Sequence, residues 1–97
     1  MTTLSEKHDG SLSISEHYRI TGMVTGDIVV KEGGNLELMG MCLGSLTILS
    51  DGLCLVYGTV KGDVVNRGAV ELFGIVDGAI HDESGSAVFH DGSIVRK

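Results

Sequence analysis

A repeated glycine pattern constrains the fold of this chain more than any other feature of its sequence. Leading glycines recur at steps of 18, 18, 16 and 18 residues, and a second glycine follows four positions after each of the first four. Internal repeats with so short a period are typical of solenoids, because one unit leaves no room for a helix beside its strands. We interpret both sets as structural corners, where a side chain would clash or demand an unfavourable φ. The leading glycines are Gly22, Gly40, Gly58, Gly74 and Gly92, and the second glycines are Gly26, Gly44, Gly62 and Gly78.

Between the glycines, apolar residues alternate with other residues, as they do in strands with one buried face. Turn-forming clusters such as KEGGN at 31–35 and DESGSA at 82–87 separate the strand-like segments. Successive units can therefore stack as rungs about 4.8 Å apart, with equivalent apolar residues in columns that fill the interior. The inward residues predicted in this way are Val24, Ile28, Val30, Leu36, Leu38, Cys42, Leu46, Ile48, Cys54, Val56, Val60, Val64, Val70 and Leu72.

The repeat covers nearly the whole chain. A step of 16 residues back from Gly22 reaches Glu6, and the match continues through Gly10, Leu12 and Ile14. A chain of 97 residues has room for one domain. The sequence therefore predicts an all-β, single-domain parallel β-helix (β-solenoid) of about five turns of 16–18 residues, with residues 10–95 as its core and residues 1–9 as an N-terminal cap or tail.

The C-terminal end of this core is expected to be more polar than the rest. Counting residues from Gly92 places His90 at an inward position, and Asn66 and Asp82 also fall at inward positions. Polar groups are tolerated inside a solenoid where they can still find hydrogen-bond partners. We therefore expect these side chains to cap the last turn.

Composition argues against several classes of function. A formal net charge of −6 with only seven Lys plus Arg disfavours nucleic-acid binding, which depends on clustered cations. No stretch approaches the roughly 20 apolar residues of a membrane-spanning helix, and the N-terminus lacks the basic start and apolar run of a secretory signal. We expect a cytoplasmic protein in which Cys42 and Cys54 are reduced and buried, and the sequence leaves open whether the two can pair.

No residue pattern indicates catalysis, a metal site or a cofactor. The histidines have no companion Cys or His at the spacing of a zinc site. Asp27 and Asp63 occupy equivalent corners, but Ser45 and Ala79 follow them in the next turns, so that no ladder of carboxylates forms. We predict no catalytic residues, no cofactor, no metal and no small-molecule substrate, and we leave open the roles of His8, His17, His81 and His90.

Apolar residues also occur where the alternation predicts outward side chains. Stacked turns would align these residues in one stripe on the surface of the rod. Exposed apolar surface of several hundred Å² commonly marks an interface, and Met and aromatic residues are typical of interfaces. The predicted interface residues are Met23, Met39, Met41, Leu43, Leu55, Tyr57, Phe73 and Ile75.

The segments GMVTGDIVV at residues 22–30 and GTVKGDVVN at residues 58–66 resemble the repeats of the bactofilins, polymer-forming bacterial cytoskeletal proteins. The resemblance extends over about residues 10–95. It implies a right-handed β-helix with a hydrophobic interior, end-to-end self-assembly into filaments, and no cofactor. The repeat pattern by itself leaves the handedness open.

Two functions are compatible with these features. The first is a non-enzymatic structural role in which the scaffold self-associates, either as a dimer through the apolar stripe or as rods joined end to end. Arg96 and Lys97 at one end, and the polar segment before Gly10 at the other, are expected to block strand edges and so to favour a closed dimer. The alternative is a small acidic immunity or inhibitor-type protein that neutralises a basic toxin or nuclease by charge complementarity. The expected partner is thus a second copy or another protein.

Overall fold

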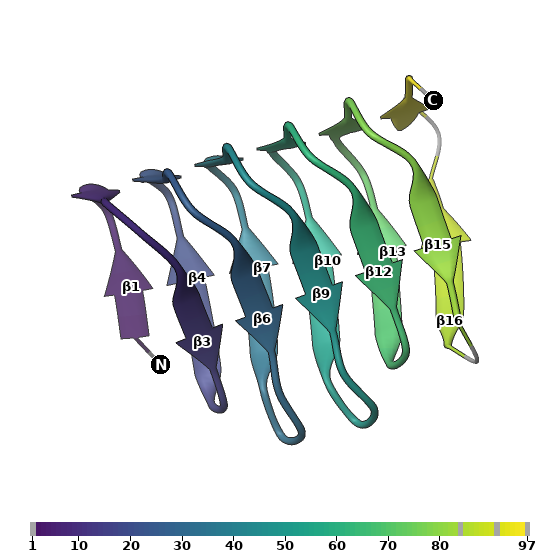
Figure 1. The fold of residues 1–97 in the computed structure, drawn as a ribbon, viewed down its shortest axis with the longest axis horizontal. Helices are drawn as coiled ribbons and strands as arrows, with labels where there is room; N and C mark the ends of the chain where they lie inside the picture. Colours follow the sequence, from purple (N-terminus) through teal and green to yellow (C-terminus); the bar gives the residue numbers. More distant parts are fainter. Residues whose placement is uncertain (1, 84, 91, 97) are drawn as a thin grey trace.

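The computed structural model describes residues 2–83, 85–90 and 92–96. This part of the chain forms seventeen short strands and no helix, and the strands build three sheets whose neighbours all run parallel. Figure 1 shows successive turns side by side along one axis, with the N-terminus at one end and the C-terminus at the other. The predicted all-β, single-domain β-solenoid of about five turns is confirmed. None of the described residues belongs to a helix with the length and apolar character needed to cross a membrane.

The chain visits the three sheets in the same order in every turn. Sheet A contains β1 (Thr2–Leu4), β4 (His17–Ile20), β7 (Asn35–Leu38), β10 (Leu53–Val56), β13 (Ala69–Leu72) and β16 (Ser86–Phe89). Sheet B contains β2 (Lys7–His8), β5 (Met23–Val24), β8 (Met41–Cys42), β11 (Thr59–Val60), β14 (Ile75–Val76) and β17 (Ile94–Val95). Sheet C contains β3 (Leu12–Ile14), β6 (Ile28–Val30), β9 (Leu46–Ile48), β12 (Val64–Asn66) and β15 (Ile80–Asp82).

The core consists of columns of apolar side chains that run along the rod. In sheet A, for example, Leu36, Cys54 and Val70 pair in register and are all buried. All the inward residues predicted from the alternation are buried, which confirms that part of the prediction. Since each strand has only two to four residues, burial depends on stacking against the turns above and below.

Glycine is required at the corner between sheets A and B because the backbone of one turn lies directly on the backbone of the previous turn. A Cβ atom at Gly58 would overlap the carbonyl oxygen of Gly40, and a Cβ at Gly40 would overlap the carbonyl oxygen of Gly22. None of these three glycines has a positive φ. The corner therefore selects glycine for lack of space, and not for its access to left-handed conformations.

The last turn departs from the predicted register. The N–H of Ile94 bonds to the carbonyl oxygen of Gly74, as that of Ile75 bonds to Gly58, so Ser93 and not Gly92 occupies the corner. Ala69 pairs with Ser86 and Ile75 with Ile94, which makes this corner two residues longer than in the turn before. Gly92 instead has a φ of 87° in the added turn, a conformation that favours glycine.

This longer corner changes which side chain points inward. Leu72 pairs with Phe89, so Phe89 continues the inner column of sheet A. The expectation that His90 points inward was therefore wrong, and His90 stacks on the outward ring of Phe73. Asn66 and Asp82 do occupy inward positions: Asn66 is fully buried, and its Nδ2 donates to Asp82 Oδ1 at 3.1 Å.

The first turn begins within the segment for which we expected a cap or tail. Strands β1 and β2 pair with β4 and β5, so residues 2–8 extend sheets A and B. Glu6 occupies the corner of this turn, since a Cβ at Gly22 would overlap its carbonyl oxygen. The match to the repeat that begins at Glu6 is therefore confirmed, and Met1 lies outside the described residues.

Replacing Gly58 by Ala tests the corner stacking. We expect Gly58→Ala to lower the free energy of unfolding by about 3 kcal/mol or more, because the backbone of two turns must separate to admit the methyl group. Gly33→Ala is the matched control. The φ of Gly33 is 80°, and an added Cβ would lie 3.8 Å from its nearest neighbour, the carbonyl oxygen of Ser15. Only the cost of a left-handed backbone at a non-glycine residue, about 1–2 kcal/mol, therefore applies. Urea denaturation measures both, and equal losses would contradict the stacking argument.

Candidate interaction surfaces

All eight predicted interface residues point outward, and none is buried. The most exposed are Met39 (48%), Tyr57 (44%) and Leu43 (40%). The eight residues do not form a single column. The A–B corner carries Met39, Tyr57 and Phe73, the middle of sheet B carries Met23, Met41 and Ile75, the B–C corner carries Leu43, and sheet A carries Leu55.

Seven of these residues lie on one side of the rod, which we call the apolar face: Met23, Met39, Met41, Leu43, Tyr57, Phe73 and Ile75. Ile94 pairs in register with Ile75 and extends the middle column of this face into the last turn. Leu55 is separate, because it lies on sheet A in register between Glu37 and Glu71. The apolar face is thus broader than the predicted stripe, but it does not include Leu55.

A ladder of stacked rings forms the edge of the apolar face. The rings of Tyr57 and Phe73 are 4.6 Å apart and nearly parallel, and those of Phe73 and His90 are 3.9 Å apart with an interplanar angle of 6°. The His90 Nε2 atom lies 3.0 Å from Glu71 Oε1, which holds the imidazole in this orientation. Stacked rings expose flat, rigid apolar area that loses little entropy on contact with a partner. The sequence pattern does not reveal His90 as a member of this edge, because a corner of constant length would place His90 inward.

Residues of opposite charge alternate along the B–C corner, at the edge of the apolar face opposite the stacked rings. Asp77 lies between two cations, 3.2 Å from Lys61 Nζ and 3.2 Å from Arg96 Nε. Arg96 thus pairs with the preceding turn at the side of the rod, and its predicted role in blocking strand edges stays a prediction. Lys97, which we expected to act with it, lies outside the described residues.

The two corner aspartates have a structural role that explains why they alternate with small residues. Asp27 Oδ1 accepts the backbone N–H of Ser45 at 2.8 Å, and Asp63 Oδ1 accepts that of Ala79 at 2.9 Å. Each carboxylate thus satisfies a donor in the next turn, much as a capping side chain does at a helix end. Such bonds link adjacent turns and give the Asp–Ser–Asp–Ala alternation a physical reason.

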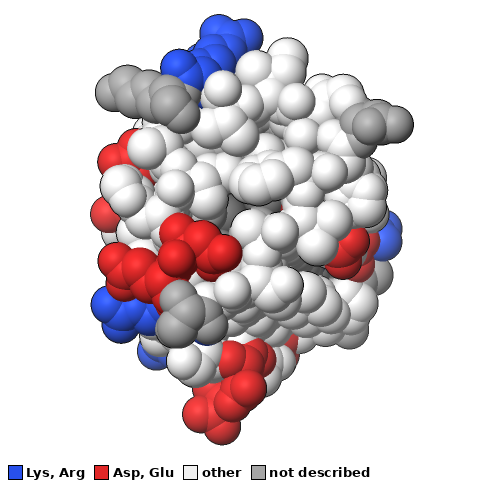
Figure 2. Space-filling model, turned by 90° about the vertical axis from the view of Figure 1, so that its right-hand side faces the viewer, with Lys and Arg blue, Asp and Glu red and all other residues white. Residues whose placement is uncertain are grey.

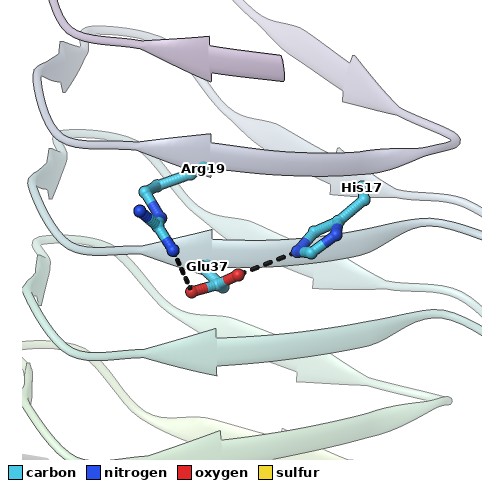
Figure 3. Close-up of polar contacts among 3 residues, drawn as sticks. All are labelled: His17, Arg19 and Glu37. Carbon is cyan, nitrogen blue, oxygen red and sulfur yellow. Dashed lines mark hydrogen bonds and ion pairs between the residues drawn. The ribbon is translucent and has the colours of Figure 1, made fainter. Parts of the chain in front are cut away.

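A polar cluster occupies the outer side of sheet A near the N-terminal end (Figure 3). Glu37 on β7 accepts from His17 at 2.8 Å and from Arg19 at 3.3 Å, both of which belong to β4. The hydrogen bond from His17, with the nearby charge of Arg19, holds the pKa of Glu37 below its ordinary value despite partial burial. The carboxylate therefore stays ionised to a lower pH than a free glutamate.

The cysteines are buried free thiols in adjacent turns. Burial raises the pKa of the Cys42 thiol to about 11. Burial also raises the pKa of Cys54, and the neighbouring Cys42 adds to that effect. Both groups are therefore poor nucleophiles at neutral pH.

The remaining histidines do not come together. His8 lies in the first turn, with its ring 3.1 Å from the carbonyl oxygen of Ser11, and His81 is exposed on the outside of sheet C. Among residues 2–83, 85–90 and 92–96, no group of three or more His, Cys, Asp or Glu side chains is arranged to hold a metal ion.

At the C-terminal end of the described strands, a hollow of about 450 Å³ is lined by Ile80, Phe89, Ser93 and Val95. Phe89 is 55% exposed and Val95 38% exposed, although both continue inner columns of the core. Figure 2 looks onto this end and shows a mostly uncharged surface with acidic and basic side chains around it. Of the residues predicted to form a polar cap, Asn66 and Asp82 occupy inward positions, whereas Ile80, Phe89 and Val95, which line the hollow together with Ser93, are apolar.

Comparison with known proteins adds no family assignment. No family model, curated protein or solved structure gives a significant match to the chain.

Removing His17 tests the polar cluster on sheet A. We expect His17→Ala to raise the pKa of Glu37 toward its ordinary value, because the principal hydrogen bond to the carboxylate is lost. Since the pKa of Glu37 is lowered in the folded state, its contribution to stability is present above the unfolded pKa and disappears as the pH falls through the folded value. Carboxyl-carbon NMR titration measures the shift. His81→Ala, which removes another exposed histidine, should leave Glu37 unchanged, and an unaltered titration in His17→Ala would refute the assignment.

Proposed function

We propose that this chain is a non-enzymatic structural protein that self-associates through the apolar face. The observation that carries the proposal is the succession of outward Met, aromatic and branched side chains on one side of the rod, in which Thr59 alone separates Met41 from Ile75 in the middle column. Monomeric proteins rarely leave such a surface uncovered, and rigid rings and methionines are favoured where proteins meet. The other faces carry ion pairs and mixed polar residues, so one side of the rod is more apolar than the others.

The face is also complementary to itself. A two-fold axis in the plane of the contact, parallel to strands β11 and β14 and midway between them, would place a second rod against this face with its long axis reversed. Tyr57 then faces Phe73 of the second copy, and Lys61 faces its Asp77. One turn further out, Met41 faces Ile94 of the second copy. The apolar columns meet each other, and at the B–C corner Lys61 and Asp77 meet charges of opposite sign, while the aliphatic stem of Arg96 lies over Leu43 of the second copy.

The resemblance to the bactofilins supports the same class of function, because members of that family assemble from β-helical units. The exposed inner residues Phe89 and Val95 form a second surface at which copies could join. A lateral dimer is nevertheless the arrangement that the residues favour. It covers Met39, Tyr57 and the ring of Phe73, which end-to-end joining would leave in water.

The alternative of an acidic inhibitor of a basic toxin or nuclease receives less support from the described residues. Several carboxylates that would have to face a basic partner already contact cations of this chain, namely Glu37, Asp77 and Glu83, and Glu71 contacts the ring of His90. Asp27 and Asp63 accept backbone N–H groups. Much of the negative charge is thus engaged within the rod.

A charge in the middle of the apolar face should prevent self-association. We expect sedimentation velocity to show that the fraction of dimer in the unmodified protein rises with protein concentration. Met41→Glu should weaken dimerisation by about tenfold or more, because a carboxylate must be desolvated in the contact.

Val65→Glu is the matched control, because Val65 is also a partly exposed outward residue within a strand, but on sheet C. It should dimerise as the unmodified chain does. A monomer at every concentration, or an equal effect of both variants, would refute self-association through this face.

A further inference from the structure

The apolar face has different chemistry along its two edges. Its edge at the A–B corner carries the stacked rings of Tyr57 and Phe73, and its edge at the B–C corner carries Lys61 and Asp77, whose Nζ and Oδ2 atoms are 3.2 Å apart. The outward residues of sheet B lie between these edges. Each turn adds one residue to every column, because outward and inward residues alternate along the chain. The face therefore has a ring edge and a charged edge, and the two are not interchangeable.

This asymmetry distinguishes the two ways in which two-fold symmetry can bring two such faces together. With the axis parallel to the rod, the two copies run parallel, and the ring edge of each copy meets the charged edge of the other. The Asp77 carboxylate would then lie against the ring of Phe73 of the second copy, where it would lose water without gaining a cation. With the axis parallel to the strands, the two copies run antiparallel, so that rings meet rings and charges meet charges. The chemistry of the edges therefore favours antiparallel rods.

The signs of the charges favour one register of the antiparallel pair. An axis that passes through β11 places Lys61 against Lys61 of the second copy, and an axis through β14 places Asp77 against Asp77. An axis midway between β8 and β11 places Lys61 against Leu43, which offers no charge. Among the described residues, only an axis midway between β11 and β14 places both Lys61 and Asp77 against an opposite charge. Since like charges in direct opposition cost free energy at an interface, this register is favoured over its neighbours.

In this register the two copies together form a closed ring of four charges of alternating sign. Each Asp77 would lie between Lys61 of its own chain and Lys61 of the second copy. The same alternation already exists within one rod, where Asp77 lies between Lys61 and Arg96. The Lys61 side chain is 49% exposed, so water screens its charge. Ion pairs at the edge of a contact therefore determine the register more than the affinity, which comes from the apolar columns.

We propose that Lys61 and Asp77 are the specificity-determining residues of self-association, and that they select an antiparallel pair of rods centred between β11 and β14. The inference rests on the proposed function, because it needs two copies that meet at the apolar face. It goes beyond that function, because the apolar columns alone would also allow parallel rods and other registers. A pair related by a two-fold axis uses the same surface once on each copy, so it is closed and does not extend into a filament through this face.

Exchanging the charges between two variants tests the assignment. Lys61→Glu and Asp77→Lys each place like charges in opposition across the pair, so each variant alone should dimerise about tenfold or more weakly than the unmodified chain. In an equimolar mixture of the two variants, opposite charges meet again at both contacts, and the mixed dimer should form about as tightly as the unmodified dimer. Sedimentation velocity over a range of concentrations measures the dimer dissociation constant of each variant and of the mixture.

Arg67→Glu is the matched control. Arg67 also forms an ion pair with the next turn, 3.0 Å from Glu83, but it lies at the corner between sheets C and A, away from the apolar face. The control variant should dimerise as the unmodified chain does. Thermal melting checks that every variant is folded, and the mixture is a second check, because two unfolded variants cannot restore each other's dimer.

A carbodiimide, which joins a carboxylate to an amine as an amide, locates the contact directly. In each of the two variants, positions 61 and 77 carry charges of the same sign and cannot be joined within one chain. A link between positions 61 and 77 in the mixture therefore joins two copies, and mass spectrometry of the digested dimer should find it. A link between two positions 61 or two positions 77, a mixture that is not restored, or single variants that dimerise normally would overturn the assignment and leave self-association standing. An unmodified chain that stays monomeric at every concentration would instead refute the proposed function, and the inference with it.

Discussion

The direct stacking of backbone on backbone at the A–B corner determines what the rest of this structure can be. Gly40 and Gly58 lie so close to the carbonyl group of the preceding turn that any side chain would force the turns apart. With the corners in contact, the strands lie at hydrogen-bonding distance and their side chains fall into register. The columns of the core, the aromatic ladder and the charge ladder all follow from that register, because each needs equivalent residues at one strand spacing.

The interior of the rod could be predicted almost completely from the sequence. A period of two within each strand and a near-constant spacing between turns locate inward residues such as Val24 and Val60 without any knowledge of tertiary contacts. The resulting core leaves little ambiguity, because a shift by one residue would expose every apolar side chain of a strand. Periodicity is therefore enough to predict the fold, whereas it contains no information on the handedness of the coil.

The last turn and the outer surface could not be predicted as well. The spacing of 18 residues between Gly74 and Gly92 imitates the repeat, although the added residues lie in the corner and move Ser93 into the glycine position. An insertion that keeps the spacing of glycines is invisible to a pattern search, so Phe89 and His90 exchanged their expected directions. Outward contacts such as that between Arg96 and Asp77 depend on long, flexible side chains, for which alternation indicates a direction but not a partner.

The position of a turn along the rod also affects how firmly it is held. Among the described strands, those of the inner turns pair on both sides, whereas β16 and β17 pair on one side. In a linear array of this kind, local opening starts at the ends and spreads inward, so the amides of the final turn have the lowest free energy of opening.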